Sequence, residues 1–289
     1  MLFLLKIAAF LIGRVPLRVS SFLSGVIGTL IYRIDRKHRE IVLGNLDLAF
    51  GEGLGRERKE EIAARVFKNL VMTFFEFMRV PWLKRKDLDG YVEFEGLEKI
   101  GKALERKNGL ILITAHFGNW ELLAASLGLS GHPIDIIARE LDNPSLEEFV
   151  RWARTRTGNR VVSKSRSMRR LLKSLSQNRI AGILIDQNVA LSEGVFVDFF
   201  GAPACTNRGP ALLASASSAP VMPIFIVRRK RAHRVLVGDE IVLVNTGDRE
   251  LDAVENTSRF TGAVEEVVRK YPEQWFWVHR RWKTRPPTG

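Results

Sequence analysis

The chain has 289 residues, of which 46% are hydrophobic, and its 45 Lys and Arg residues against 32 Asp and Glu residues give a net charge of +13. Such a chain can build a large buried core, and its positive surface favours anionic partners: nucleic acid, anionic lipid headgroups, phosphorylated substrates or an acidic protein. Because Cys205 is the only cysteine in the sequence, an internal disulfide is excluded and a cysteine-rich metal site is disfavoured. We interpret Cys205 as an inert thiol, which is compatible with a cytoplasmic environment.

Residues 1–34 are mostly apolar, but Lys6, Arg14 and Arg18 lie among them and Pro16 divides them. The longest stretch without a charge, residues 19–32, is shorter than the roughly 20 residues that cross a bilayer at right angles. On a helical projection the three cations fall within an arc of about 120°, which is typical of an amphipathic helix in a membrane interface. The pattern predicts a membrane anchor over residues 1–34, either a tilted span or an interfacial hairpin. A packed hairpin of a soluble domain is the alternative.

A basic cluster at residues 33–39 follows this segment, as expected where a membrane segment exits on the cytoplasmic side. The first apolar run is not followed by a small-residue cleavage site, so we do not predict a secretory signal. The apolar side chains expected to enter the membrane are Phe3, Leu4, Leu5, Phe10, Phe22 and Leu23.

Beyond residue 34, hydrophobic periodicity predicts helices that alternate with short apolar strands. The helices are expected at residues 56–80, 97–107, 121 onward, 143–156, 167–178, 208–218 and 258–270. The strands are expected at residues 109–115, 134–138, 180–185, 221–228 and 234–244. This alternation predicts an α/β fold with a mixed, mainly parallel sheet flanked by helices.

The hexapeptide His-Phe-Gly-Asn-Trp-Glu at residues 116–121 follows the first of these strands, where open α/β sheets bind their ligands. On one helix His116 and Glu121 would point about 140° apart, so they can meet only if His116 lies in the loop and Glu121 in the first helical turn. Asn119 is a candidate N-cap for that helix. A carboxylate there would hold the imidazole in the tautomer that accepts a proton from a hydroxyl. Because this spacing also arises by chance, a histidine that merely ends a strand is the alternative.

Three more polar segments follow apolar strands at the same edge of the expected sheet, at residues 139–144, 186–188 and 194–210. They bring Arg139, Asp186 and Gln187, and Arg208 toward His116. Taken singly, Arg139 could pair with a neighbouring acid on the surface and Asp186 could cap a turn. Together they form the basic, acidic and aromatic rim that an enzyme acting on an apolar, anionic substrate requires.

With these residues in place, the chain resembles the bacterial lipid A biosynthesis acyltransferases, the late (lauroyl and myristoyl) group of the lysophospholipid acyltransferase superfamily. The resemblance covers nearly the whole chain, and only the loop at 188–193 departs from the family pattern. The matching pieces lie at residues 45–50, 116–121, 138–139 with 142–144, 186–187, 194–201, 203 with 206, 209–211 and 272–286.

The resemblance implies a glycerolipid acyltransferase-like domain over residues 35–289, on the cytoplasmic face of the inner membrane. Its expected reaction moves a fatty acyl chain from acyl-acyl carrier protein to a hydroxyl of a Kdo-bearing, phosphorylated lipid A precursor. Acyl carrier protein, the phosphorylated glycolipid and the membrane are then the expected partners, with no nucleic acid. No metal or other cofactor is expected, since acyl carrier protein serves as a co-substrate.

A thioester is already activated, so general-base catalysis suffices for this transfer. We expect His116 to deprotonate the acceptor hydroxyl and Glu121 to stabilise the imidazolium, so that Glu121→Ala is severe and Glu121→Asp partly active. Arg139, or backbone amides near residues 118–119, would bind the oxyanion. The expected substrate contacts, including basic residues for lipid phosphate or carrier protein, are Arg139, Asn119, Asp186, Gln187, Lys164 and Arg208.

Two other classes of function remain as alternatives. The same chemistry could serve another acceptor, such as a lysophospholipid, glycerol phosphate or a glycosylated phosphoinositide. A non-catalytic nucleic-acid or membrane binder would also be basic, and Trp and Arg alternate at residues 275–285. Against a nucleic-acid binder, the sequence has no helix-turn-helix or zinc-finger pattern. Against a serine hydrolase, it has no Gly-x-Ser-x-Gly element.

Overall fold

A central sheet organises the protein, as seen in the computed structural model, which describes residues 1–163, 167–230 and 232–287. Within those residues seven strands follow the order β1-β9-β8-β2-β5-β3-β4, and all neighbours are parallel except β8 and β9. The strands are β1 (Val92–Glu95), β2 (Leu110–Thr114), β3 (Ile134–Ala138), β4 (Arg160–Ser163), β5 (Ile180–Leu184), β8 (Val221–Arg228) and β9 (His233–Val237). The predicted mixed, mainly parallel sheet is therefore confirmed.

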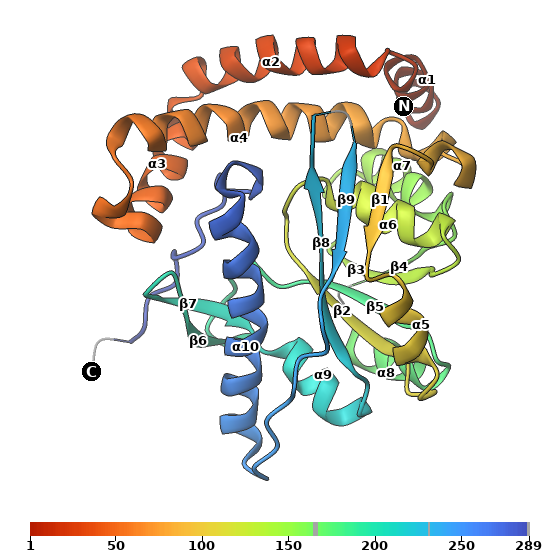
Figure 1. The fold of residues 1–289 in the computed structure, drawn as a ribbon, viewed down its shortest axis with the longest axis vertical. Helices are drawn as coiled ribbons and strands as arrows, with labels where there is room; N and C mark the ends of the chain where they lie inside the picture. Colours follow the sequence, from red (N-terminus) through yellow and green to blue (C-terminus); the bar gives the residue numbers. More distant parts are fainter. Residues whose placement is uncertain (164–166, 231, 288–289) are drawn as a thin grey trace.

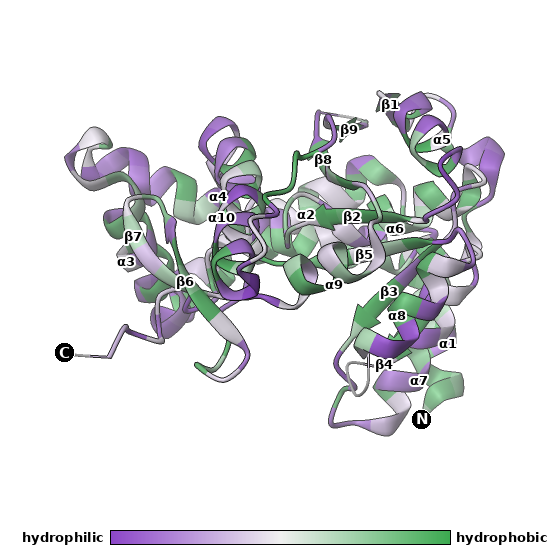
Figure 2. Ribbon diagram, turned by 90° about the horizontal axis from the view of Figure 1, so that it is seen from below, coloured by the Kyte–Doolittle hydropathy of each residue, from purple (hydrophilic) through white to green (hydrophobic). Residues whose placement is uncertain are grey.

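Helices cover both faces of this sheet (Figure 1). Along β2, Leu110 and Leu112 pack into a core with α5 (Glu98–Leu104) and α6 (Trp120–Leu129). Ile111 and Ile113 point into the opposite core. That second core is formed with α8 (Ser167–Ser176), α9 (Gly209–Ser217) and α10 (Arg249–Lys270). Burial on both faces explains why the central strands read as unbroken apolar runs, visible as hydrophobic colouring of β2 and β5 in Figure 2.

The remaining elements frame the carboxyl edge of the sheet. Helix α7 (Pro144–Thr155) packs beside α6 and β4, and an antiparallel hairpin is formed by β6 (Gly194–Phe199) and β7 (Ala202–Asn207). Short 3-10 turns lie at η1 (Gly51–Gly53), η2 (Val80–Trp82), η3 (Arg85–Leu88) and η4 (Pro272–Gln274).

Several elements differ from the sequence-based expectation. Strands β1 and β4, the β6–β7 hairpin and helix α3 (Arg36–Phe50) were not predicted. Helix α10 begins at Arg249 rather than at residue 258, because Asp248 caps it by accepting hydrogen bonds from the backbone of residues 250 and 251. Strand β9 ends at Val237, and the chain to residue 244 continues as an irregular segment.

The N-terminal helices form a separate layer at one side of the sheet. Pro16 separates α1 (Leu2–Gly13) from α2 (Leu17–Ile34), and α2 runs alongside α4 (Arg56–Phe77), as the top of Figure 1 shows. By length and composition, Leu17–Ile34 could cross a membrane. It buries the small residues Ser20, Ser24 and Gly28 toward α4.

The opposite face of this hairpin exposes large apolar side chains. Of the predicted anchor residues, Phe3, Leu4 and Phe22 are 73%, 67% and 69% exposed, and Phe10 is 37% exposed. Leu5 and Leu23 are half-buried. An exposed apolar surface of this extent marks a contact with a membrane or with another molecule.

Candidate active site

The candidate site lies between the neighbouring strands β2 and β5, from which the chain continues to opposite sides of the sheet. The chain leaves β2 through α6 on one face and leaves β5 toward α9 on the other, which opens a crevice at the carboxyl ends of the strands. The parallel register pairs Thr114 with Leu184. Two residues further along each strand, the same register sets His116 opposite Asp186.

His116 and Asp186 form a hydrogen-bonded pair. Nδ1 of His116 lies 2.9 Å from Oδ1 of Asp186, and the backbone N–H of His116 donates to Oδ2 at 2.9 Å. Asp186 is buried, whereas the His116 side chain keeps 22% of its surface exposed. The contact places the hydrogen on Nδ1, which leaves the opposite ring nitrogen, Nε2, as the proton acceptor.

The C-terminal segment completes this pair from a distant part of the chain. Nε1 of Trp275 donates to Oδ2 of Asp186 at 2.8 Å, and the backbone N–H of Phe276 donates to the carbonyl oxygen of His116 at 3.0 Å. Nε2 of His279 accepts from the backbone N–H of Asn188 at 2.8 Å, which fixes the loop after Asp186. These three residues lie in a segment that carries the family resemblance, but no role in the site was predicted for Trp275, Phe276 or His279.

The charges of the pair reinforce each other. Burial lowers the pKa of His116, but the carboxylate of Asp186 and, at longer range, that of Glu121 raise it more, so the pKa of His116 lies above the usual 6.5. Burial raises the pKa of Asp186, but His116 and the indole of Trp275 lower it more, so the pKa of Asp186 lies below its usual 3.8. Asp186 is therefore ionised at neutral pH.

Glu121 lies in the first turn of α6, and His116 lies in the preceding loop, as the spacing required. However, the carboxylate that contacts His116 is that of Asp186 and not that of Glu121, which corrects our expectation. Glu121 forms a bidentate ion pair with Arg154 of α7, at 3.0 Å to Nε and 2.6 Å to Nη2. Arg154 was missed because nothing in the sequence places α7 against the start of α6.

Two of the four residues between His116 and Glu121, Gly118 and Asn119, are buried and held in place. Gly118 has φ +58°, and a Cβ atom there would lie 1.9 Å from the carbonyl oxygen of Ile226, so this position requires glycine. Asn119 caps α6 as predicted, since its Oδ1 accepts from the backbone N–H of Leu122 at 3.0 Å. Because Asn119 is fully buried, it cannot contact the substrate as we expected.

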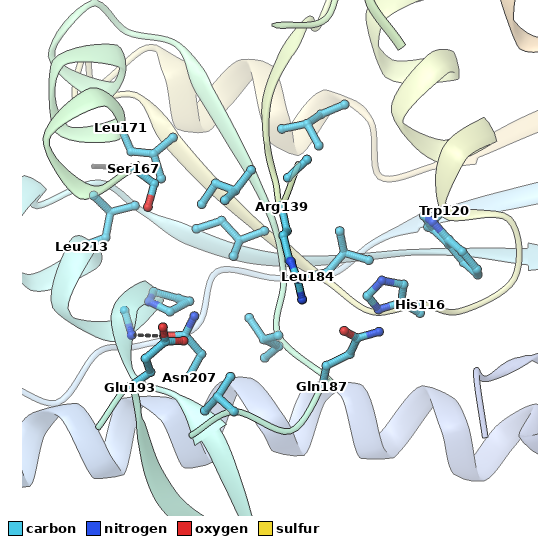
Figure 3. A pocket seen from close by; sticks show the side chains of 18 of the residues that line it. His116, Trp120, Arg139, Ser167, Leu171, Leu184, Gln187, Glu193, Asn207 and Leu213 are labelled. Carbon is cyan, nitrogen blue, oxygen red and sulfur yellow. Dashed lines mark hydrogen bonds between the residues drawn. The ribbon is translucent and has the colours of Figure 1, made fainter. Parts of the chain in front are cut away.

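A cavity of about 830 Å³ opens beside His116. Its walls include apolar side chains from β3, β5, α8 and α9, among them Ile136, Ile183 and Leu213. The predicted residues Arg139, Gln187 and Arg208 line it, and Figure 3 shows Arg139, Gln187 and His116 around the same part of the cavity. The list of predicted contacts also contains Lys164, which lies outside the described residues.

The cationic side chains at the rim differ in their surroundings. Arg139 is 82% exposed and lies 3.7 Å from Asp142, whereas Arg208 forms an ion pair with Glu250 at 2.7 Å. Within the described residues no group of three or more His, Cys, Asp or Glu side chains is arranged to hold a metal ion.

Comparison with known proteins identifies the family. A profile of the bacterial lipid A biosynthesis acyltransferases matches residues 1–284. The chain belongs to this family. It is similar to the lipid A biosynthesis lauroyltransferase of Escherichia coli (strain K12), with 28% identity over 279 residues, 96% of this chain and 89% of the relative. The palmitoleoyltransferase of the same strain is 25% identical over 276 residues, with 94% and 88% covered.

A third relative, the lipid A biosynthesis myristoyltransferase of the same strain, is 24% identical over 263 residues, covering 90% of this chain and 80% of the relative. The protein is therefore an acyltransferase, as the resemblance implied. In this acyltransferase the His116–Asp186 pair, the adjacent apolar cavity and the cationic rim are the parts that its chemistry can use.

Proposed function

We propose that this acyltransferase moves a fatty acyl chain from acyl-acyl carrier protein to a hydroxyl of a Kdo-bearing, phosphorylated lipid A precursor. The observation that carries the proposal is the His116–Asp186 pair, at 2.9 Å, beside an apolar cavity of about 830 Å³. Relatives named for lauroyl, palmitoleoyl and myristoyl transfer in lipid A biosynthesis support both the acyl group and the acceptor class.

In the proposed reaction the acceptor hydroxyl attacks the thioester carbonyl carbon while Nε2 of His116 takes the hydroxyl proton. An ester C–O bond forms, the C–S bond breaks, and the leaving thiolate recovers the proton from the imidazolium. Asp186 keeps the hydrogen on Nδ1 and stabilises the imidazolium, the part that a carboxylate takes in a catalytic triad. Because the thioester is activated, no step of this scheme calls for a covalent intermediate or a metal.

The tetrahedral intermediate needs hydrogen-bond donors for its oxyanion. The backbone N–H of Gly118 already donates to the carbonyl oxygen of Gln274 at 2.8 Å. We therefore assign the oxyanion contact to the side chain of Arg139 or Gln187, since both line the cavity with His116 (Figure 3). The apolar walls then accept the acyl chain, and the cationic rim faces the phosphorylated acceptor and the acidic carrier protein.

The test is transfer of a radiolabelled acyl group from acyl-acyl carrier protein to a Kdo-bearing lipid A precursor, by the native protein and by His116→Ala. We expect a labelled, more lipophilic product and a loss of about 10²–10⁴-fold or more in the variant. Unchanged transfer by His116→Ala would remove His116 from the mechanism. Transfer to a lysophospholipid or glycerol phosphate but not to the lipid A precursor would keep the chemistry and replace the acceptor.

We also propose that α1 and α2 attach the enzyme to the cytoplasmic face of the inner membrane by lying in the interface. Helix α2 is fastened along α4 through Ser20, Ser24 and Gly28, and a Cβ atom on Gly28 would lie only 2.6 Å from Cα of Lys68. Helix α4 carries charged residues between Arg56 and Lys68 and again at Glu76. If α2 crossed the bilayer with this packing intact, it would draw those charges into hydrocarbon, at several kcal/mol each.

Interfacial attachment and a membrane-spanning α2 differ in the side of the membrane on which the turn between α1 and α2 lies. In a Cys205→Ser background, the single variants Arg18→Cys, in the first turn of α2 next to that connection, and Arg285→Cys, in the catalytic domain, are treated with a membrane-impermeant maleimide. Interfacial attachment expects both to react in inside-out vesicles and neither in spheroplasts. If Arg18→Cys reacts only in spheroplasts, α2 spans the membrane.

A further inference from the structure

The proposed chemistry does not use a buried carboxylate near the C-terminal end of α4. Glu76 is 2% exposed, and its Oε1 accepts hydrogen bonds from Nη1 of Arg228, from Nε2 of His233 at 2.9 Å and from the Tyr91 hydroxyl at 3.2 Å. Burial raises the pKa of Glu76, but Arg228 and His233 hold it well below its usual range. Burying charges is unfavourable even when they are paired, so packing alone does not account for this cluster.

The second oxygen of Glu76 reaches the loop that carries His116. Oε2 accepts a hydrogen bond from Nδ2 of Asn119 at 2.7 Å, and both side chains are buried. The other end of the Asn119 amide caps α6 through the backbone N–H of Leu122. One carboxylate thus holds the residue that begins the helix bearing Glu121.

The neighbouring residue, Gly118, is held by the same group of side chains. Thr73, one turn before Glu76 on α4, donates from its hydroxyl to the carbonyl oxygen of Gly118 at 3.2 Å and accepts from Nη2 of Arg228 at 3.0 Å. Gln274 accepts from the backbone N–H of Gly118 at 2.8 Å, and its side-chain oxygen accepts from the backbone N–H of Arg228 at 2.7 Å. The loop after His116 is therefore fixed from α4, from β8 and from the C-terminal segment.

We propose that Glu76 is a positioning residue for the reaction: it holds Asn119 directly and Gly118 by way of Arg228 and Thr73, and so keeps His116 in register with Asp186. Glu76 contacts neither the substrate nor the reacting atoms. The inference rests on the proposed role of His116 as the base. A displacement of about 1 Å at a reacting group can lower a rate about 100-fold, so a carboxylate outside the cavity can control the rate in this way.

The variant Glu76→Gln tests this role, because the amide keeps the size of the side chain but removes the charge that Arg228 and His233 bind. We expect kcat to fall by about 10- to 100-fold. The KM values for donor and acceptor should stay within about twofold, because the cavity is unchanged. Glu76→Asp, which restores the charge, should recover part of kcat.

A buried carboxylate elsewhere supplies the matched control. Asp135 lies near the start of β3, at the amino ends of the parallel strands and therefore away from the candidate site. Its side chain is 4% exposed and forms an ion pair with Arg179 at 2.6 Å. Asp135→Asn should lower the Tm as Glu76→Gln does and leave kcat within about twofold, measured well below both transitions. The proposal is overturned if Glu76→Gln keeps its kcat or loses it only in proportion to its unfolded fraction.

If Glu76→Gln does not fold, Thr73→Val decides the question, because it removes the contact with Gly118 while keeping the shape of the side chain. A lower kcat at constant KM supports the proposal, and an unchanged kcat overturns it. The result is also separable from the proposed function. Full activity of His116→Ala would overturn the assignment of the base, whereas an inactive His116→Ala beside a fully active Glu76→Gln would overturn the positioning role alone.

The Nδ1 proton of His116 gives a readout that does not depend on turnover. Its nuclear magnetic resonance signal is identified by its absence in His116→Ala, and it reports the hydrogen bond to Asp186 at 2.9 Å. We expect the signal to shift or broaden in Glu76→Gln and to stay in place in Asp135→Asn. A signal that is unchanged in Glu76→Gln would contradict the proposal.

Discussion

The protonation of His116 sets the pH range in which the base is available. A general base must be unprotonated, and the pKa of His116 lies above the usual 6.5 because Asp186 outweighs burial. We expect kcat/KM to rise with pH through a midpoint above 6.5 and then level off. In Asp186→Asn the midpoint should move to lower pH, and the plateau should fall by about 10²–10⁴-fold. Rates measured from about pH 5 to pH 9 at constant ionic strength would show both.

A midpoint that stays in place in Asp186→Asn would mean that another group titrates.

The contribution of His116 to stability should fall over the pH range in which kcat/KM rises. Since the pKa of folded His116 is raised, its contribution to the free energy of unfolding is complete below the unfolded pKa and is lost as pH rises through the folded value. Asp186 has a lowered pKa, so its contribution is present above its unfolded pKa and is lost in acid.

The ion pair between Glu121 and Arg154 predicts coupled mutational effects. If Glu121 acts through Arg154, Glu121→Ala and Arg154→Ala should each lower kcat/KM severely, by about 100-fold. The kcat/KM of the double variant should then be no lower than that of the less active single variant. Glu121→Asp should stay partly active, since a shorter carboxylate still offers Arg154 a partner. Additive losses in a double-mutant cycle of kcat/KM would show that Glu121 and Arg154 act independently.

At the scale of residues, the sequence predicted which side chains lie together at the carboxyl edge of the sheet. It did not predict which of them form hydrogen bonds with each other. His116, Asp186 and Gln187 were all expected at one edge of the sheet, because each follows an apolar strand. Glu121 was given the contact with His116 because it is near in sequence. The actual partner, Asp186, depends on β5 lying next to β2, and a strand order with β5 inserted between β2 and β3 leaves no local signal.

At the scale of elements, α2 contains two glycines in different surroundings, and its packing on α4 depends on only one of them. A Cβ atom on Gly28 would collide with the backbone of Lys68, whereas one on Gly25 would meet nothing within 4 Å. Gly25→Ala should raise the free energy of unfolding by about 0.5–1 kcal/mol through helix propensity alone. Gly28→Ala should lower it by about 1–3 kcal/mol, because the two helices must separate. Denaturant titrations of both variants measure the difference.

Equal stabilisation by both alanines would contradict the packing of α2 on α4. Separation of these helices should also reduce kcat in Gly28→Ala, since α4 holds the loop after His116 through Thr73 and Glu76. Gly25→Ala, which leaves the packing intact, should keep the native kcat.

Two of the elements missed from the sequence were missed for different physical reasons. Strand β4 has four residues, all at least partly exposed, so it lacks an apolar run. In the β6–β7 hairpin, Phe200 and Gly201 both adopt positive φ at the turn, and positive φ at a phenylalanine is not expected from local preference. Its contacts with α10 supply the stabilisation instead. The buried strands β2, β3 and β5 were predicted well because each is a short apolar run bounded by polar residues.

For the molecule as a whole, the net charge and the exposed apolar surface both favour binding to an anionic membrane. The net charge of +13 attracts an anionic bilayer, and the outer face of α2 supplies side chains that can enter it. Helix α1 packs against α7, and α7 also lines the cavity beside His116. In the proposed attachment, a membrane that binds the hairpin therefore lies close to a helix that lines the cavity.

This arrangement predicts that membrane binding and chemistry can be separated. Phe22 and Val26 are 69% and 52% exposed on the outer face of α2. Burying two such side chains in lipid is worth about 3–6 kcal/mol, so Phe22→Asp with Val26→Asp should weaken binding to anionic vesicles by about 100-fold or more. Val242→Asp, at an equally apolar residue that is 75% exposed far from the hairpin, is the control and should bind as the native protein does.

With a detergent-dispersed acceptor the double variant should keep the native kcat, because the His116–Asp186 pair is untouched. Sedimentation with vesicles at increasing salt would measure binding, which should weaken with salt in the native protein as the attraction of its cations is screened. Native-like sedimentation of the double variant would show that another surface holds the membrane. Loss of kcat in detergent would show instead that the outer face of α2 supports the fold, and that the soluble-hairpin interpretation of residues 1–34 is correct.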